Sequence, residues 1–170
     1  MNDTKPYHVT FVCSGNICRS PMGEVILRDL LAQARLGDDV EVDSAGTTGY
    51  EVDGPADARA VAELCRHGYD GSAHVARQFR SGWFAETDLV LAADEGHVRA
   101  LRGWAPTAAD AEKVRLMREF DPEAVAAGTL EVDDPWYGEA EDFERCFGEV
   151  EASCRGVLKH LQQTLARSSS

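Results

Sequence analysis

The apolar positions of this chain follow two periods that alternate along its length. Short runs of apolar or alternating residues predict four strands, at residues 9–12, 40–43, 88–92 and 114–117. Stretches in which apolar side chains recur every three or four positions predict helices at residues 20–35, 56–66, 94–101 and 139–166. A shorter helix is expected around Trp83 and Phe84, whereas residues 70–80 and most of 124–133 are predicted to be loop.

This alternation of strands and helices favours an α/β fold, in which a parallel sheet carries helices on both faces. Ligands of such folds bind at the carboxyl ends of the strands, and the first predicted strand ends beside Cys13. The pattern fills residues 1–167, so we expect one domain there, followed by a disordered tail at Ser168, Ser169 and Ser170.

The charge balance of the 170-residue chain narrows the classes of partner. There are 30 Asp and Glu residues against 17 Lys and Arg, and the net charge of −13 argues against nucleic acid or membrane partners. No apolar stretch is long enough to span a membrane, and the polar N-terminus lacks the apolar core of a signal peptide, so we expect a cytoplasmic protein. The five cysteines and five histidines show no zinc-type spacing, so we expect no metal and no other cofactor.

One short segment joins the first predicted strand to the first predicted helix. A loop at a helix N-terminus points several backbone N–H groups into a small space, where the helix dipole also favours an anion. Gly15 allows a tight turn there, and the planar fork of Arg19 matches two phosphate oxygens. Ser20 is a candidate N-cap, with Pro21 suited to the first helical position. The expected phosphate-binding loop comprises Ser14, Gly15, Asn16, Ile17, Cys18, Arg19 and Ser20.

Cys13 lies where the strand ends, inside this positive field. Such a field favours the thiolate form of a cysteine at neutral pH, and the thiolate is the nucleophilic form. A nucleophilic sulfur beside a phosphate cradle predicts phosphoryl transfer through a cysteinyl-phosphate. A phenol is a poor leaving group, so a general acid is expected as well, and the segment Asp133-Asp134-Pro135 offers two carboxylates.

The loop VCSGNICRSP resembles the phosphate-binding loop of the low-molecular-weight protein tyrosine phosphatases, and the resemblance extends over roughly residues 7 to 165. It implies a four-stranded parallel sheet in the order 2-1-3-4, and hydrolysis of phosphotyrosine in protein substrates by Cys13 and Arg19. Asp134 matches the family's Asp-Pro acid because it directly precedes Pro135, and Asp133 is the competitor for that role. We expect a monomer or weak dimer.

Other side chains are expected to complete the site. Trp136 and Tyr137 follow the acid and can form walls for a phenol ring, and by resemblance Tyr50 forms the opposite lip. Ser20 can donate a hydrogen bond to the sulfur of Cys13. The remaining supporting residues are implied by the resemblance: the loop amide of Asn16, its partners Ser44 and His74, and Asp94.

Three alternatives share the loop pattern. A thioredoxin-coupled arsenate reductase has the same fold but needs two further cysteines near residues 80–95, where this chain has none. A protein arginine phosphatase carries Thr where this chain has Ile17. A non-catalytic phosphate-binding module would not need Cys13, Arg19 and Asp134 together. A further expectation is redox control, in which Cys13 and Cys18 form a protective disulfide.

Overall fold

A computed structural model describes residues 5–168. It contains a four-stranded sheet in the order β2-β1-β3-β4, in which every pair of neighbouring strands is parallel. This confirms the predicted strand order. The strands are β1 (Tyr7–Cys13), β2 (Val40–Gly46), β3 (Leu89–Ala92) and β4 (Val114–Leu116).

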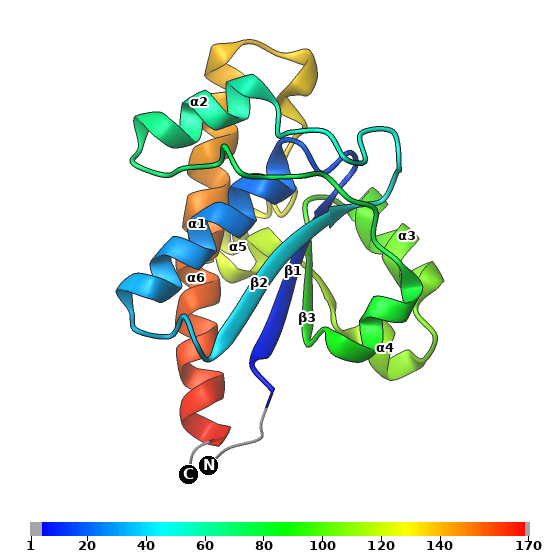
Figure 1. Ribbon diagram of the computed structural model, residues 1–170. Coiled ribbons are helices and arrows are strands. Elements are labelled where there is room, and N and C mark those ends of the chain that lie inside the picture. The colour runs from blue at the N-terminus through cyan, green and yellow to red at the C-terminus, as the bar shows by residue number, and fades with distance from the viewer. Residues whose placement is uncertain (1–4, 169–170) are drawn as a thin grey trace.

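Helices cover both faces of the sheet (Figure 1). The α-helices are α1 (Arg19–Gln33), α2 (Ala58–Arg66), α3 (Glu95–Trp104), α4 (Ala108–Glu112), α5 (Pro122–Ala127) and α6 (Ala140–Ser168). Three short 3-10 helices lie between them, at η1 (Ser81–Glu86), η2 (Met117–Phe120) and η3 (Pro135–Tyr137). Helices α1 and α6 lie on one side of the sheet, and α3 and α4 lie on the other.

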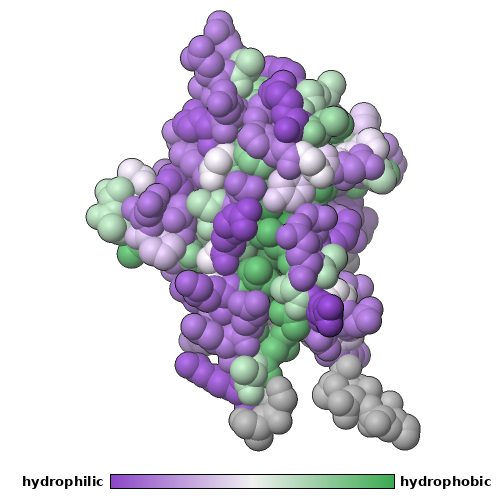
Figure 2. Space-filling view, turned by 90° about the vertical axis from the view of Figure 1, so that its left-hand side faces the viewer, coloured by the Kyte–Doolittle hydropathy of each residue, from purple (hydrophilic) through white to green (hydrophobic). Residues whose placement is uncertain are grey.

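Strand β1 supplies side chains to two separate apolar cores because successive residues of a strand face opposite ways. Val9, Phe11 and Cys13 belong to the core under α1 and α6, whereas Val12 belongs to the core under α3. All four residues of β3 are buried, as expected for a parallel strand that is covered on both faces. The outer surface over α1, α2 and α6 is mostly hydrophilic, with a seam of apolar side chains along it (Figure 2).

The helix boundaries correct several details of the sequence-based prediction. Helix α1 begins at Arg19, so Ser20 lies in its first turn and is not the N-cap, and Pro21 is the third helical residue. Helix α5 occupies the start of a segment predicted to be mostly loop; the Asp121 side chain caps it and Gly128 ends it in a left-handed conformation. Helix α4 was not predicted because its five residues bury no side chain. Ser168 ends helix α6, which contradicts its placement in a disordered tail, and Ser169 and Ser170 lie outside the described residues.

Candidate active site

The loop from Cys13 to Arg19 connects β1 to α1 at the carboxyl edge of the sheet. Its turn depends on Asn16, which has a φ of 60°, a left-handed conformation that asparagine tolerates better than most residues. Gly15 was expected to provide the turn, but the steric need for glycine lies at Gly46 in β2. A Cβ at Gly46 would lie 2.5 Å from the Ser14 carbonyl oxygen and 3.2 Å from the Asn16 nitrogen. The end of β2 therefore supports the loop by close backbone contact.

The side chain of Asn16 is fully buried beneath the loop and orients two serines. Its Oδ1 accepts the backbone N–H of Arg77 at 3.0 Å, which directs Nδ2 toward Ser20 Oγ at 2.8 Å and Ser44 Oγ at 2.9 Å. Each serine oxygen thus accepts a hydrogen bond from the Asn16 amide and can donate a hydrogen bond elsewhere through its own hydroxyl. Ser44 donates to Glu24 Oε1 at 2.5 Å. Ser20 Oγ has two acceptors within reach, the Cys13 sulfur at 2.9 Å and the Ala45 carbonyl oxygen at 3.4 Å, and the sulfur is the nearer one.

The Cys13 sulfur has two polar neighbours at the start of α1. Ser20 Oγ lies 2.9 Å from Sγ, and the backbone N–H of Ser20 points at Sγ over 3.4 Å. The hydroxyl and the backbone amide of Ser20 thus both lie within hydrogen-bond reach of the sulfur. His74 also belongs to this support, although it contacts the backbone rather than the amide of Asn16: its Nε2 lies 2.7 Å from the Asn16 carbonyl oxygen.

Arg19 is only 2% exposed. It contacts Asp94, just after β3, and also the segment 132–137 that carries Asp134, here called the acid loop. Its NH1 donates to Asp94 Oδ2 at 2.9 Å and to the Val132 carbonyl at 2.8 Å. Burial by itself would lower the pKa of Arg19, but the charges of Cys13, Asp134 and Asp94 outweigh it and raise that pKa. Arg19 Nε is buried without a hydrogen-bond partner among the described residues, as expected of a donor that serves a bound oxyanion.

His97 was not singled out by the sequence analysis, but it joins Arg19's partner to the phosphate-binding loop. Its backbone N–H donates to Asp94 Oδ1 at 3.1 Å, and its Nδ1 accepts the Asp94 backbone N–H at 3.2 Å. The ring proton therefore lies on Nε2, which is 2.9 Å from Ser14 Oγ. Burial lowers the pKa of His97 to about 4, so the ring is neutral at physiological pH. The sequence pattern that could have identified His97 is its position three residues after Asp94, the N3 position of a capping box.

Asp134 rather than Asp133 faces the reaction site. The Asp134 carboxylate accepts the Trp136 backbone N–H at 3.1 Å through Oδ1 and lies 3.7 Å from Arg19 NH2 through Oδ2. Its side chain lines the cavity above Cys13, whereas Asp133 is not among the lining residues. This placement favours Asp134 as the acid.

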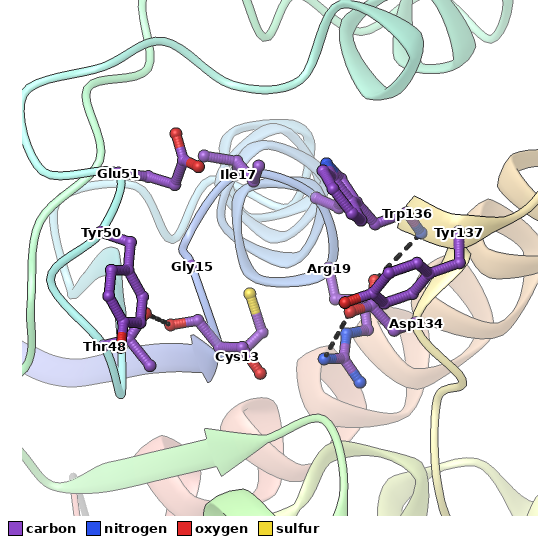
Figure 3. Close-up of a pocket in the computed structure, with 12 residues that line it drawn as sticks. Cys13, Gly15, Ile17, Arg19, Thr48, Tyr50, Glu51, Asp134, Trp136 and Tyr137 are labelled. Carbon is purple, nitrogen blue, oxygen red and sulfur yellow. Dashed lines mark hydrogen bonds and ion pairs between the residues drawn. The ribbon is translucent and has the colours of Figure 1, made fainter.

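A cavity of about 360 Å³ opens between the phosphate-binding loop and the aromatic residues (Figure 3). Tyr50 stands on one side, and Trp136 and Tyr137 stand on the other, with their rings edge to face at 4.7 Å. Tyr50 and Tyr137 are 91% and 86% exposed, so they are available to a ligand and not committed to the core. The cavity is lined by Cys13, Ser14, Gly15, Ile17, Cys18, Arg19, Thr48, Tyr50, Glu51, Asp134, Trp136 and Tyr137.

The predicted site residues thus divide into lining and supporting groups. Asn16 and Ser20 are fully buried and do not line the cavity, so their side chains support the loop from behind. Ser44, His74 and Asp94 likewise act on other site residues from outside the cavity. Thr48 and Glu51, which the sequence analysis did not identify, line it. Within residues 5–168, no group of three or more metal-ligating side chains could hold a metal ion.

Comparisons of the sequence with a family model and with known proteins agree on one family. Residues 8–167 match the model of the low molecular weight phosphotyrosine protein phosphatases. A low molecular weight protein-tyrosine-phosphatase from Streptomyces coelicolor is 53% identical and covers 92% of this chain and 94% of its own. The human low molecular weight phosphotyrosine protein phosphatase is 38% identical, over 89% of this chain and 93% of its own.

A crystal structure of a protein tyrosine phosphatase from Entamoeba histolytica, with Hepes in its active site, superposes with a TM-score of 0.86. It is 29% identical and covers 93% of this chain and 98% of its own. The match of nearly the whole sequence, the shared fold and the cysteine–arginine loop agree with one another. The chain belongs to the low-molecular-weight phosphotyrosine protein phosphatase family.

Proposed function

We propose that this protein hydrolyses phosphotyrosine in protein substrates through a cysteinyl-phosphate on Cys13, with Asp134 as general acid. The observation that carries the proposal is that Cys13, Arg19 and Asp134 line one cavity with aromatic walls. A thiolate nucleophile, a buried guanidinium and a carboxylate at the mouth are the groups that phosphate ester hydrolysis requires.

In the first step the Cys13 thiolate attacks phosphorus and forms the P–S bond while the P–O bond to the tyrosine ring breaks. The departing phenolate takes its proton from the Asp134 carboxyl group. Arg19 and the loop N–H groups hold the phosphoryl oxygens, where Arg19 Nε has no other partner among the described residues.

In the second step water attacks the cysteinyl-phosphate and gives a proton to the Asp134 carboxylate. The P–S bond breaks, and inorganic phosphate and the Cys13 thiolate are released. Ser20, whose hydroxyl lies 2.9 Å from the sulfur, stabilises the thiolate as it leaves.

The cavity supports phosphotyrosine as the substrate class. Cys13 is 3% exposed and lies at its base, whereas Tyr50, Trp136 and Tyr137 stand at its mouth. A phosphorylated phenol can place its phosphate on the loop and its ring between these aromatic side chains. Ile17 lines the same space and adds apolar surface that suits a ring better than a guanidinium.

The test is metal-free hydrolysis of peptides that carry phosphotyrosine, phosphoarginine or phosphoserine, compared side by side. We expect the phosphotyrosine peptide to be hydrolysed fastest. Cys13→Ser should abolish turnover while vanadate or phosphate still binds, since Arg19 and the loop remain. Turnover by Cys13→Ser above about a thousandth of wild type, well outside the loss expected for a missing nucleophile, would overturn the covalent mechanism.

The role of Asp134 is tested by comparing two substrates whose leaving groups differ in their need for a proton. Asp134→Ala should slow hydrolysis of a phosphotyrosine peptide by ~10²–10⁴-fold and p-nitrophenyl phosphate by much less, because nitrophenolate needs little protonation. An equal loss on both substrates would make Asp134 a positional group, and Asp133 would then be the acid to test.

We also propose that the protein works in the cytoplasm, where thiols stay reduced, and that Cys18 protects Cys13 from overoxidation. Support comes from the site itself: Cys18 lines the same cavity as Cys13, and all five cysteines are free thiols. Within the described part of the chain, no helix is long and apolar enough to cross a membrane.

A further inference from the structure

The segment that leads into Asp134 is held by three arginines on three consecutive carbonyl groups. Arg118 NH1 donates to the Glu131 carbonyl at 2.9 Å, and Arg19 NH1 donates to the Val132 carbonyl at 2.8 Å. Arg145 NH2 donates to the Asp133 carbonyl at 3.2 Å. The backbone just before Asp134 is therefore fixed by charged side chains from three elements: η2, α1 and α6.

Two of these arginines share one counter-ion. Glu149 lies one turn after Arg145 on α6, and its Oε1 is 3.7 Å from Arg145 Nε. Its Oε2 is 3.4 Å from Arg118 NH1. The Arg118 side chain is 12% exposed and that of Glu149 is 21% exposed, so solvent screens the contact between these two less than it screens a surface ion pair. The Arg145 side chain is 36% exposed. Arg145 also contacts Asp142 Oδ1, at 3.2 Å.

The acid loop has few other connections to the body of the protein. Val132 is tied to the sheet edge, where its N–H donates to the Ala93 carbonyl at 2.8 Å. Among residues 5–168, no backbone-to-backbone hydrogen bond joins segment 133–137 to another element; the bond from Gly138 N–H to the Pro135 carbonyl is local. The direction in which the chain leaves Asp133 thus depends on the side chains that hold its carbonyl.

We propose that Arg145, Arg118 and Glu149 form a clamp that sets the position of the Asp134 carboxylate over the cavity through the backbone of Glu131 and Asp133. The proposal rests on the proposed function, in which Asp134 is the general acid. Arg145, Arg118 and Glu149 are positioning residues, because none of them lines the cavity. Asp134 is bonded directly to Asp133, so a shift of the Asp133 carbonyl moves the acid with it.

The chemical consequence is specific to proton transfer. A general acid works only within hydrogen-bond reach of the leaving oxygen, and a misplacement of about 1 Å can cost on the order of 10²-fold. The nucleophile and the phosphate-binding loop are held by different contacts, from Ser20, Asn16 and Gly46. Arg19 contacts the segment at Val132, but it is also held by Asp94, outside the clamp. Loosening the clamp should therefore impair protonation of the leaving group and leave phosphate binding intact.

Arg145→Met tests the clamp, because methionine keeps the apolar part of the side chain and removes the donor. We expect kcat for a phosphotyrosine peptide to fall about tenfold, a part of the ~10²–10⁴-fold that general acid catalysis supplies. For p-nitrophenyl phosphate we expect less than about a twofold change, and the inhibition constant of inorganic phosphate should stay the same. Arg145→Lys, which keeps the charge and one donor, should recover part of the peptide activity.

Arg155→Met is the matched control, since Arg155 is on the same helix and pairs with Glu151 at 3.6 Å, away from the acid loop. It should change neither substrate's kcat. Glu149→Gln provides a second test that keeps the shape of the side chain and removes the shared negative charge, and it should give the same substrate-dependent loss as Arg145→Met. If Arg145→Met does not fold, Arg145→Lys and Glu149→Gln give the answer.

A double-mutant cycle separates positioning from general destabilisation. In an Asp134→Ala background, Arg145→Met should have no further effect on kcat, because the acid it positions is absent. An Arg145→Met enzyme that loses activity equally on both substrates, or that loses it again in the Asp134→Ala background, overturns the clamp. If Asp134→Ala itself has wild-type activity, the acid assignment fails and the clamp fails with it; an impaired Asp134→Ala beside an unimpaired Arg145→Met overturns the clamp alone.

Discussion

The buried His97 ring makes the stability of this protein depend on pH in a defined window. Its Nδ1 accepts a hydrogen bond from a backbone N–H, and its Nε2 forms a hydrogen bond with the Ser14 hydroxyl. These contacts use one ring nitrogen as an acceptor and the other as a donor, so they fit the neutral ring. Burial is the largest cause of its low pKa; Arg19 lowers it further, whereas Asp94, Asp134 and Glu131 act in the opposite direction. His97→Gln replaces the ring with a polar side chain that does not titrate.

The sign of the effect follows from proton binding in the two states. The pKa of His97 is about 4 in the fold against 6.5 for the ordinary residue, so between these values the unfolded chain binds more protons. Stability from this group is therefore full above about pH 6.5 and is lost as the pH falls toward 4. Between about pH 7 and about pH 4.5, wild type should lose on the order of 2 kcal/mol more unfolding free energy than His97→Gln.

The assay is urea unfolding of both proteins at several pH values in this window. Titrations of groups that do not contact His97 cancel in the comparison, including that of His8, whose pKa is raised by a hydrogen bond to Asp43 and whose contribution has the opposite sign. His160→Gln is the control, because the pKa of His160 is also lowered by burial but its ring is only partly buried. If wild type and His97→Gln lose the same stability to within about 0.5 kcal/mol, the neutral-ring interpretation is refuted.

Three further predictions concern substitutions in or beside the phosphate-binding loop. Gly46→Ala should lower activity by about 10²-fold, since its Cβ would lie 2.5 Å from the Ser14 carbonyl oxygen, whereas Gly37→Ala, with no atom within 4 Å of the new Cβ, should behave as wild type. Ser20→Ala should lower kcat by about 10- to 100-fold, the worth of a hydrogen bond to a charged group, without changing phosphate binding. Peroxide-treated wild type should recover activity with dithiothreitol, and Cys18→Ser should not; equal recovery would leave Cys18 a packing residue, in keeping with burial that raises its pKa.

The reactive centre could be predicted from sequence because its geometry is local. Cys13, the loop and Arg19 lie within seven consecutive residues, and the strand and helix on either side fix their arrangement. The candidate acid lies in a second segment far along the chain, and the Asp-Pro pair was the signal that pointed to it. Spacing alone could not choose between Asp133 and Asp134, because the choice depends on which side chain the folded backbone turns into the cavity. Asp134 lines the cavity and Asp133 does not.

The residues that the sequence did not reveal act through contacts between distant segments. His97 reaches Ser14 from 83 residues away, and Gly46 approaches the loop through the pairing of β1 with β2. For Ser20 the sequence offered two roles, and the structure keeps the contact with the Cys13 sulfur but not the N-cap, because the helix begins one residue earlier. Arg145 and Glu149 are one helical turn apart, a spacing that is typical of ion pairs on exposed helix surfaces, so the spacing does not mark them as part of a site.

The burial of Arg19 in a protein of net charge −13 has a kinetic consequence. A phosphate ester that approaches from solvent meets an acidic body first, and it encounters the guanidinium only after it has entered the cavity. Repulsion acts at long range and is screened by salt over about 10 Å, whereas the short contact with Arg19 is shielded from salt by the protein around it. We therefore expect free anionic substrates to be slowed on the way in and held on arrival. Protein substrates whose own positive charge offsets the negative charge of their phosphate should then have an advantage.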